Sequence, residues 1–314
     1  MIAPFLLSSE TRHSIGSSIW RSGVFSSFFS VRSGFYCSFK KMAVRLFEGK
    51  DHAVSYLQYR VTPHEMISKI MSYMEQKTQQ QYKLAVDVGC GPGKWTVLLA
   101  PYFTRVVGTD ISQAMVERAL AKSHPPNISF RHCPAEEMPF ASGEVDLVTA
   151  MTAAHWFDRP RFLQEVDRVL RPGGCLALLS YTMDMILEYG EVSKVLNNIC
   201  QEFYAALLPY RSSYLGPSSR KIYSDMFNSC SYPDKEWTEC HPVRRTLPVS
   251  GFIGMVETFS SYQQLKQKDP SEADHLSHRI LTKLLTAMNV PCPDTEVMVI
   301  VNYFGMLACK PSSE

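Results

Sequence analysis

The stretch "LAVDVGCGPGKWT", residues 84–96, places three glycines and a proline directly after a short apolar run that contains one aspartate. This order predicts a buried strand that turns into a helix, and a glycine-rich turn lets the backbone approach a ligand closely. Asp110 stands 17 residues after Gly93, at the end of the next apolar stretch. An acidic side chain at that place can accept hydrogen bonds from both hydroxyls of a ribose. We therefore predict a nucleoside-binding site at this turn.

Helical and apolar segments alternate around the turn. Residues 62–77 place their apolar side chains on one helical stripe. Strands are predicted at residues 83–89, 105–112, 128–133, 144–151 and 175–181, with helices between them at 94–103, 113–122 and 161–170. Strands that are apolar throughout are typical of a parallel sheet buried between helices. The fold class predicted is therefore α/β.

Three short signals mark helix ends in this region. Ser112 is a good N-cap for the helix that follows it, and Asp158 with Pro160 suits the start of the next one. The glycines in "RPGG", residues 171–174, predict the end of that second helix.

The alternating pattern stops after residue 181. We predict a helical cap over residues 183–235, and a C-terminal part, 236–314, that completes the sheet with strands at 243–249 and 296–309. The ligand-binding core is then residues 42–182.

Residues 1–41 differ in composition from the rest, with eleven serines and a single acidic residue, Glu10. Such a leader is typical of a mitochondrial transit peptide. The alternative is that Met42 begins the natural protein and the leader is an upstream extension. Both interpretations predict a disordered leader. The expected location is cytoplasmic, or mitochondrial if residues 1–41 act as a transit peptide.

The composition excludes several classes of protein. The net charge is +2, which argues against nucleic acid as a partner. No apolar run approaches the roughly 18 residues that a membrane span needs. The nine cysteines form no CxxC pair, so we expect neither a disulfide framework nor a metal site.

The turn distinguishes between two nucleoside cofactors. A dinucleotide site has a third glycine for helix packing, whereas Trp95 and Thr96 occupy that part of this turn. Asp87 would repel a pyrophosphate but would suit an amino group or a sulfonium ion. These features favour S-adenosylmethionine over NAD.

Several motifs in chain order resemble those of class I S-adenosylmethionine-dependent methyltransferases. They are "VDVGCGPG" (86–93), "VVGTDIS" (106–112), "AEEMPF" (135–140), "VDLVTAMTAAHWFD" (145–158) and "VLRPGGCLAL" (169–178). The "AHWFD" within them is most similar to the trans-aconitate methyltransferase-like (methyltransferase type 11) subgroup. The resemblance implies a Rossmann-like fold with a mostly parallel, seven-stranded sheet, an antiparallel last strand and a helical cap insertion.

The resemblance also implies how the cofactor is held. Asp87 and the backbone of Gly89, Cys90 and Gly91 would bind the methionine end of S-adenosylmethionine.

At the other end of the cofactor, Asp110 would accept the ribose hydroxyls and Ile111 would pack on the adenine. Ala135 would offer its N–H to the adenine ring. Many relatives place an aspartate where this chain has Pro134, so Glu136, water or backbone would have to meet the adenine amino group.

Methyl transfer from a sulfonium is an in-line displacement, in which the protein mainly supplies alignment. A carboxylate acceptor needs no general base because it is ionised at pH 7. His155 follows the fourth predicted strand and is the candidate catalytic residue, either as a base or as a contact. The alternative is a histidine that only fixes its loop.

Candidate substrate-binding residues flank the core. Tyr56 and Arg60 are four apart and would share a helical face, from which the arginine could clamp a carboxylate or form a surface ion pair. Tyr214 and Arg220 could line an acid-binding lid or be ordinary surface. We predict a monomeric methyltransferase that acts on a small molecule, with an aconitate-like carboxylic acid as the expected acceptor. The alternatives are a quinone, lipid or protein acceptor, a non-catalytic cofactor-binding module, and an NAD-dependent oxidoreductase.

Overall fold

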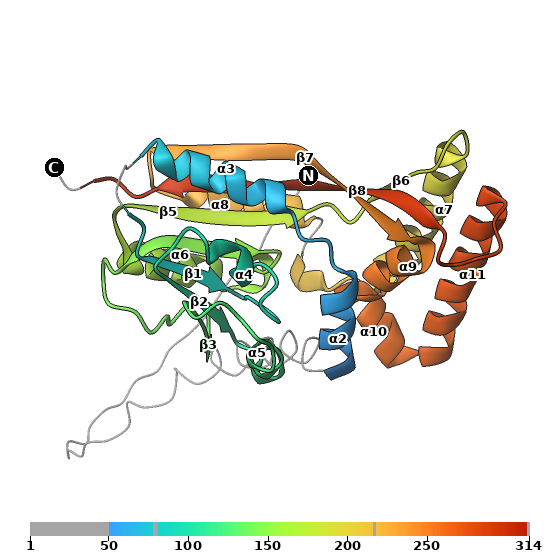
Figure 1. Cartoon of the computed structure of the whole chain (residues 1–314), viewed down its shortest axis with the longest axis horizontal. Coiled ribbons are helices and arrows are strands. Elements are labelled where there is room, and N and C mark those ends of the chain that lie inside the picture. Colours follow the sequence, from blue (N-terminus) through green and yellow to red (C-terminus); the bar gives the residue numbers. More distant parts are fainter. Residues whose placement is uncertain (1–49, 78–80, 216–217, 313–314) are drawn as a thin grey trace, which may run out of the picture. The chain divides into compact units, whose positions relative to one another are not determined.

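The computed structural model describes residues 50–77, 81–215 and 218–312, so the predicted leader, residues 1–41, lies outside the described residues. The described strands are β1 (Leu84–Val88), β2 (Arg105–Asp110), β3 (Ile128–His132), β4 (Val145–Met151), β5 (Leu170–Tyr181), β6 (Ile186–Glu188), β7 (Asp234–Pro248) and β8 (Glu296–Cys309). They form one sheet in the order β3-β2-β1-β4-β5-β8-β6, and β7 pairs with β8. Figure 1 shows this sheet with helices packed against it.

Strands β1 to β5 pair in parallel, and β8 runs antiparallel to its neighbours. This confirms the α/β fold with a mostly parallel sheet and an antiparallel last strand. The described sheet has eight strands, however, where we predicted seven. The short β6 is the difference: β5 pairs with β8 only over Tyr303–Cys309, and β6 occupies Met298–Ile300 of the same strand.

The described α-helices are α2 (Lys50–Tyr59), α3 (His64–Glu75), α4 (Thr96–Leu99), α5 (Gln113–Leu120), α6 (Arg159–Val169), α7 (Ser193–Leu207), α8 (Ser219–Ser229), α9 (Val249–Glu257), α10 (Ser260–Lys268) and α11 (Pro270–Met288). The helix predicted over 62–77 is confirmed as α3, with Met66, Ile70 and Met74 buried. In the described residues, no helix has the length and apolar character that crossing a bilayer requires.

The structure confirms some of the predicted helix ends. Ser112 caps α5 by accepting a hydrogen bond from the Met115 N–H, as predicted. Asp158 occupies the N-cap of α6, but its side chain makes no capping hydrogen bond. Helix α6 ends at Val169, just before residues 171–174, as predicted, but these residues belong to β5, which begins at Leu170.

Four helices, α7, α9, α10 and α11, pack on one another and form what we call the helical lobe (Figure 1). We predicted the cap over 183–235, whereas three of the four lobe helices come from residues 249–288. Helix α8 packs instead on β5 and β8.

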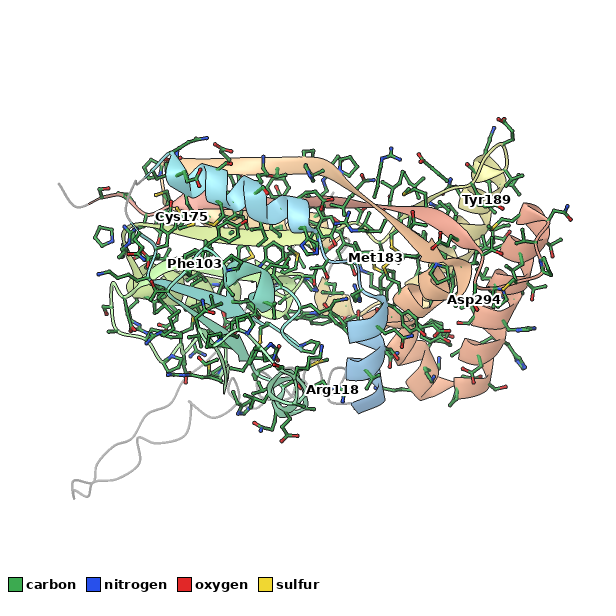
Figure 2. The ribbon with its side chains drawn as sticks, in the orientation of Figure 1. Phe103, Arg118, Cys175, Met183, Tyr189 and Asp294 are labelled. Carbon is green, nitrogen blue, oxygen red and sulfur yellow. The ribbon has the colours of Figure 1, made fainter. Side chains whose placement is uncertain are left out.

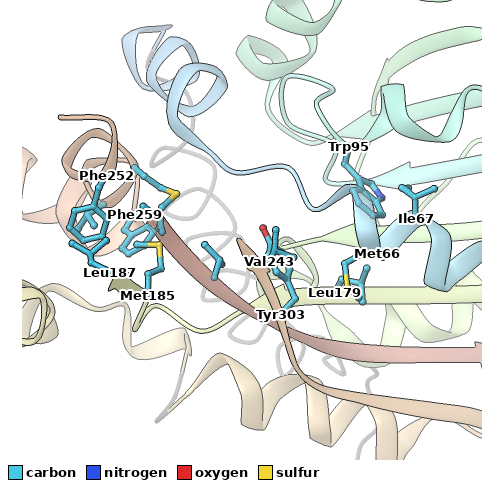
Figure 3. Close-up of a cluster of buried hydrophobic side chains, with 14 of the residues drawn as sticks. Met66, Ile67, Trp95, Leu179, Met185, Leu187, Val243, Phe252, Phe259 and Tyr303 are labelled. Carbon is cyan, nitrogen blue, oxygen red and sulfur yellow. The ribbon is translucent and has the colours of Figure 1, made fainter. Parts of the chain in front are cut away.

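One apolar cluster runs from the helical lobe to α3 and β5. Figure 3 shows Phe252 and Phe259 with Met185 at the lobe, and Met66, Trp95 and Leu179 nearer the sheet. Phe103 and Cys175, labelled in Figure 2, belong to the same cluster. The lobe and the sheet therefore share a core, which gives the lobe a defined position beside the strand ends.

Gly305 of β8 pairs with Leu179 of β5 in the antiparallel ladder. A methyl group on it would overlap the Leu178 carbonyl oxygen and lie 2.9 Å from the Leu179 Cα. We expect Gly305→Ala to lower the free energy of unfolding by about 1–3 kcal/mol, because backbone rather than a side chain must move. Urea denaturation measures this. Gly251→Ala in α9, where the nearest atoms are Pro248 side-chain carbons, is the control; an equal loss in both variants would contradict the argument.

Candidate active site

The glycine turn follows β1 and is held by its own amides. The Cys90 N–H donates to the Thr109 carbonyl (2.9 Å), and the Gly91 N–H donates to the Asp110 carboxylate (2.8 Å). A methyl group on Gly89 would lie 2.5 Å from the Ala153 Cβ, whereas one on Gly91 would meet nothing within 4 Å. The turn is therefore packed against the chain at Gly89 and open at Gly91, which leaves its outer side accessible to a ligand.

A cavity lies beside this turn, at the carboxyl ends of β1, β4 and β5. Its walls include Asp87 from β1, Trp95 after the turn, Thr152 after β4, Tyr181 at the end of β5, and Arg60 after α2. Open α/β sheets bind ligands at this edge. The structure thus brings Asp87 together with Arg60, which precedes the whole sheet in the chain.

Asp87 is buried, and its carboxylate accepts hydrogen bonds from the Thr96 hydroxyl (2.6 Å) and the Thr149 hydroxyl (3.2 Å). Burial raises the pKa of Asp87 to about 7, although the two hydroxyls oppose this and the Asp110 charge adds to it. Neither threonine was predicted as a site residue. The available signal was a polar residue inside an apolar strand, since Thr149 of β4 pairs directly with Asp87.

Asp110 ends β2 and accepts the N–H groups of Gly91 and Ser112, both at 2.8 Å. Burial raises its pKa. Ile111 beside it keeps 39% of its surface exposed, which is unusual for a large apolar side chain at a sheet edge. The Ala135 N–H makes no hydrogen bond within the described part of the chain. A carboxylate, an uncovered apolar side chain and an available amide together fit a nucleoside.

Glu136 is buried, and it accepts a hydrogen bond from the Asp158 N–H (2.7 Å). This contact ties its loop to the start of α6. A contact between Glu136 and adenine stays a prediction.

Arg60 is a cation surrounded by aromatic rings. Its guanidinium carbon lies 4.8 Å from the ring centroid of Tyr56, 4.9 Å from Phe259 and 5.4 Å from Tyr181. The Nε donates to the Thr258 hydroxyl (2.6 Å), and Nη2 donates to the Thr258 carbonyl (3.1 Å). Burial lowers the pKa of Arg60. No carboxylate among the described side chains, residues 54–56, 58–77, 81–215 and 218–312, is within ion-pair distance of it, so this charge lacks a counter-ion from those residues.

Lys94 adds a second cation to the cavity wall. Its ammonium donates to the Arg60 carbonyl (2.5 Å). Burial lowers the pKa of Lys94 to about 8, and the positive charges of Lys122 and Arg60 contribute. Lys94 was not predicted as a site residue, although it directly follows the glycine turn. Asp87 and the two cations give the cavity one negative and two positive groups.

His155 lies in a short 3-10 helix, η1 (Ala154–Trp156), after β4. Its Nδ1 is buried and has no hydrogen-bond partner among the described residues. Burial lowers the pKa of His155 to about 3, and the positive charges of Arg211, Arg60 and Arg159 lower it further. The imidazole is therefore neutral at pH 7 and is a weak base.

We expect His155→Gln to leave the pH dependence of kcat/KM between pH 5 and 8 unchanged, because a group with a pKa of about 3 does not titrate there. This prediction concerns the shape of the pH profile and not the absolute value of kcat/KM. A wild-type inflection near pH 6.5 that this variant removes would contradict the neutral imidazole.

Tyr214 and Arg220 do not line the cavity. The Tyr214 hydroxyl donates to the Phe157 carbonyl (2.8 Å), and its ring stacks on Trp156 at 6.3 Å between centroids. Arg220 forms an ion pair with Glu239 of β7. The structure gives both residues contacts of their own rather than a place beside Arg60.

Thr152, Trp95 and Tyr181 are, like Lys94, residues of the cavity wall that were not predicted as site residues. Thr152 has a φ of +55°, a strained value for a threonine, and strain of this kind concentrates at functional sites. Trp95 Nε1 and the Tyr181 hydroxyl are buried without a hydrogen-bond partner among the described residues. Only their positions, after the turn and at the end of a predicted strand, could have indicated them. Among the residues that the structure describes, no group of three or more His, Cys, Asp or Glu could hold a metal ion.

Several known proteins have sequences similar to this chain. A family model described as "Methyltransferase domain" matches residues 86–178. A Dictyostelium discoideum protein named as a methyltransferase is 30% identical over 209 residues, which cover 66% of this chain and 74% of that protein. Trans-aconitate 2-methyltransferase of Deinococcus radiodurans is 39% identical over 103 residues, 32% of this chain and 38% of the relative.

The fold is shared as well. The solved structure of a type II methyltransferase from Anaeromyxobacter dehalogenans matches with a TM-score of 0.61 and 21% identity, over 80% of this chain and 97% of that one. The Asp110 edge fits the nucleoside, and the cavity has a carboxylate and cations that suit the charged methionine end. The chain therefore belongs to the methyltransferase family, and it is an enzyme that uses S-adenosylmethionine.

Proposed function

We propose that this enzyme transfers the methyl group of S-adenosylmethionine to a carboxylate of a small organic acid. The observation that carries the proposal is the cation of Arg60, which lies in the cavity wall among three aromatic rings and makes no ion pair with a described residue. A buried charge without a counter-ion is costly. An anionic acceptor bound at Arg60 would supply that counter-ion.

The other residues of the site would bind S-adenosylmethionine. Asp87 would bind the methionine amino group and Lys94 its carboxylate, with Gly89 and Cys90 alongside, since all four line the cavity. At the adjacent edge Asp110 would accept the ribose hydroxyls, Ile111 would cover the adenine, and the Ala135 N–H would donate to its ring. When bound, S-adenosylmethionine supplies a methyl group already activated by the sulfonium.

The weak basicity of His155, the predicted catalytic residue, favours a carboxylate over a phenol or an amine as acceptor. Burial lowers the pKa of His155 to about 3, so its imidazole is poorly suited to remove a proton from an acceptor. A carboxylate is ionised at pH 7 and needs no proton removed. The trans-aconitate 2-methyltransferase of Deinococcus radiodurans, by its name, acts on such an acid. Arg60, with Tyr56 beside it, would position the acid.

The test is a methyl-transfer screen with isotopically labelled S-adenosylmethionine and four acids: trans-aconitate, succinate, benzoate and hexanoate. We expect a labelled product whose methyl group is released by mild base, as from an ester. A panel without any labelled acid, or a base-stable product, would overturn the proposal.

Arg60→Met provides a second test at the proposed acceptor site. We expect it to raise the KM for the best acid of the panel, while the Kd of S-adenosylmethionine measured by calorimetry stays within about twofold. Lys221→Met removes an exposed cation paired with Asp225 and serves as the control. If Arg60→Met instead weakens only the binding of S-adenosylmethionine, the arginine binds the methionine carboxylate and its assignment to the acceptor site fails.

A further inference from the structure

We propose that Tyr181 is a specificity-determining residue of the acceptor site, where its hydroxyl donates a hydrogen bond to the acceptor carboxylate beside Arg60. This inference rests on the proposed function. It adds a residue that none of the sequence motifs contains.

The Tyr181 hydroxyl is a buried polar group with an unused hydrogen bond. It is shielded from solvent and has no partner among the described residues, and Tyr181 lines the same cavity as Arg60. Leaving such a group unsatisfied costs stability, and native proteins keep few of them. A ligand that accepts the bond would account for its retention.

The position of Tyr181 suits an acceptor rather than the nucleoside. Tyr181 ends β5, and β5 pairs with β4 through Leu179 and Met151, directly before Thr152 of the cavity wall. Asp110 and Ile111 belong to β2 and the loop after it, on the other side of β1 in the strand order. Tyr181 is therefore two strands from β1 on the side away from the ribose site.

The ring of Tyr181 is held in place by its neighbours. Its centroid lies 5.4 Å from that of Tyr303, at an interplanar angle of 62°, and 6.4 Å from that of Phe259. The Arg60 guanidinium carbon lies 5.4 Å from the Tyr181 centroid. A fixed phenol next to a guanidinium presents two donors to one anion, and donors held by packing orient a ligand precisely because they lose little freedom on binding it.

One oxygen of a carboxylate can accept hydrogen bonds from both of these donors, because each oxygen has two lone pairs. With one oxygen held by Tyr181 and Arg60, the other is free to face the methyl group. That oxygen forms the new bond to the methyl carbon while the carbon–sulfur bond breaks and its electron pair stays on sulfur. No proton moves, so the Tyr181 hydroxyl and the Arg60 guanidinium keep their protons throughout. Tyr181 acts here by binding and orienting the acid.

The experiment compares Tyr181→Phe with wild type on the acid of the panel above that is methylated fastest. We expect the KM for that acid to rise roughly tenfold, because a hydrogen bond to a charged group is lost. The calorimetric Kd of S-adenosylmethionine should stay unchanged. Tyr73→Phe is the matched control: it also removes a partly buried hydroxyl, which donates to Asp234 outside the cavity, and its KM should equal that of wild type.

Incorporation of 3-fluorotyrosine at position 181 gives a second measurement that preserves the ring packing. Its more acidic hydroxyl is a stronger donor, so the KM for the acid should fall. An unchanged KM in both Tyr181 variants, or an equal loss of cofactor binding, would overturn the inference while the proposed function stands. If wild type methylates none of the acids, the proposed function itself fails, and this assignment fails with it.

Discussion

Asp110→Ala is expected to weaken the binding of S-adenosylmethionine by about 1–3 kcal/mol, or roughly 5- to 150-fold in Kd. The carboxylate holds the turn through the Gly91 and Ser112 amides, each at 2.8 Å, and each oxygen keeps a lone pair for a ribose hydroxyl. The variant loses both the turn and the ribose contacts. Calorimetric titration with S-adenosylmethionine measures the loss.

Two comparisons separate those contributions. Asp110→Asn keeps one oxygen acceptor and should lose less affinity than Asp110→Ala. The 2′-deoxy analogue of S-adenosylhomocysteine should be less sensitive to either variant than S-adenosylhomocysteine itself, because one hydroxyl is missing. Asp225→Ala removes a surface carboxylate paired with Lys221 and serves as the control. An unchanged Kd for Asp110→Ala would refute the ribose role.

Asp87→Asn is expected to change the response to pH of both cofactor binding and stability. Burial raises the pKa of Asp87 to about 7. The affinity of the wild-type protein for S-adenosylmethionine should therefore rise between pH 6 and 8, as the carboxylate ionises and can pair with the methionine amino group. The asparagine variant should bind more weakly and without this rise.

The stability effect has the opposite sign. The pKa of Asp87 is about 7 in the folded protein and 3.8 without the fold, so the folded state favours the protonated form. This contribution to stability is complete below pH 3.8 and is lost as the pH rises through 7. Asp87→Asn lacks the ionisation, so its unfolding midpoint in urea relative to wild type should be higher at pH 8 than at pH 5. Thr96→Val removes one hydrogen-bond donor to the Asp87 carboxylate, so this variant should lose the stability contribution of Asp87 at a higher pH than wild type does. An equal difference at both pH values would contradict the buried ionisation.

The order of the elements followed from local pattern because apolar period and turn chemistry act over a few residues. The helix at α3, the strands β1 to β5 and the cap at Ser112 were all predicted in this way. The short β6 was not, since three residues carry too little periodicity and depend on the free edge of β8.

The composition of the helical lobe also could not be predicted from local sequence pattern. The helices of the lobe come from 193–207 and from 249–288, and α9 begins directly after β7, whose last residue pairs with the first residue of β8. The predicted cap boundary at residue 235 followed a change in composition rather than a packing unit.

The sequence by itself predicted the cofactor site, because the parts of that site are close in the chain and follow the ends of two successive strands. The roles that we propose for Asp87, the glycines and Asp110 follow from the ends of β1 and β2. Only the tertiary structure decided which side chains surround the cavity. Arg60 contacts Thr258 across 198 residues, and its guanidinium carbon lies 5.4 Å from the ring centroid of Tyr181, which ends β5 and pairs with Tyr303 of β8. Burial, unpaired donors and missing counter-ions arise from such distant contacts, so they have no signature in any short stretch of sequence.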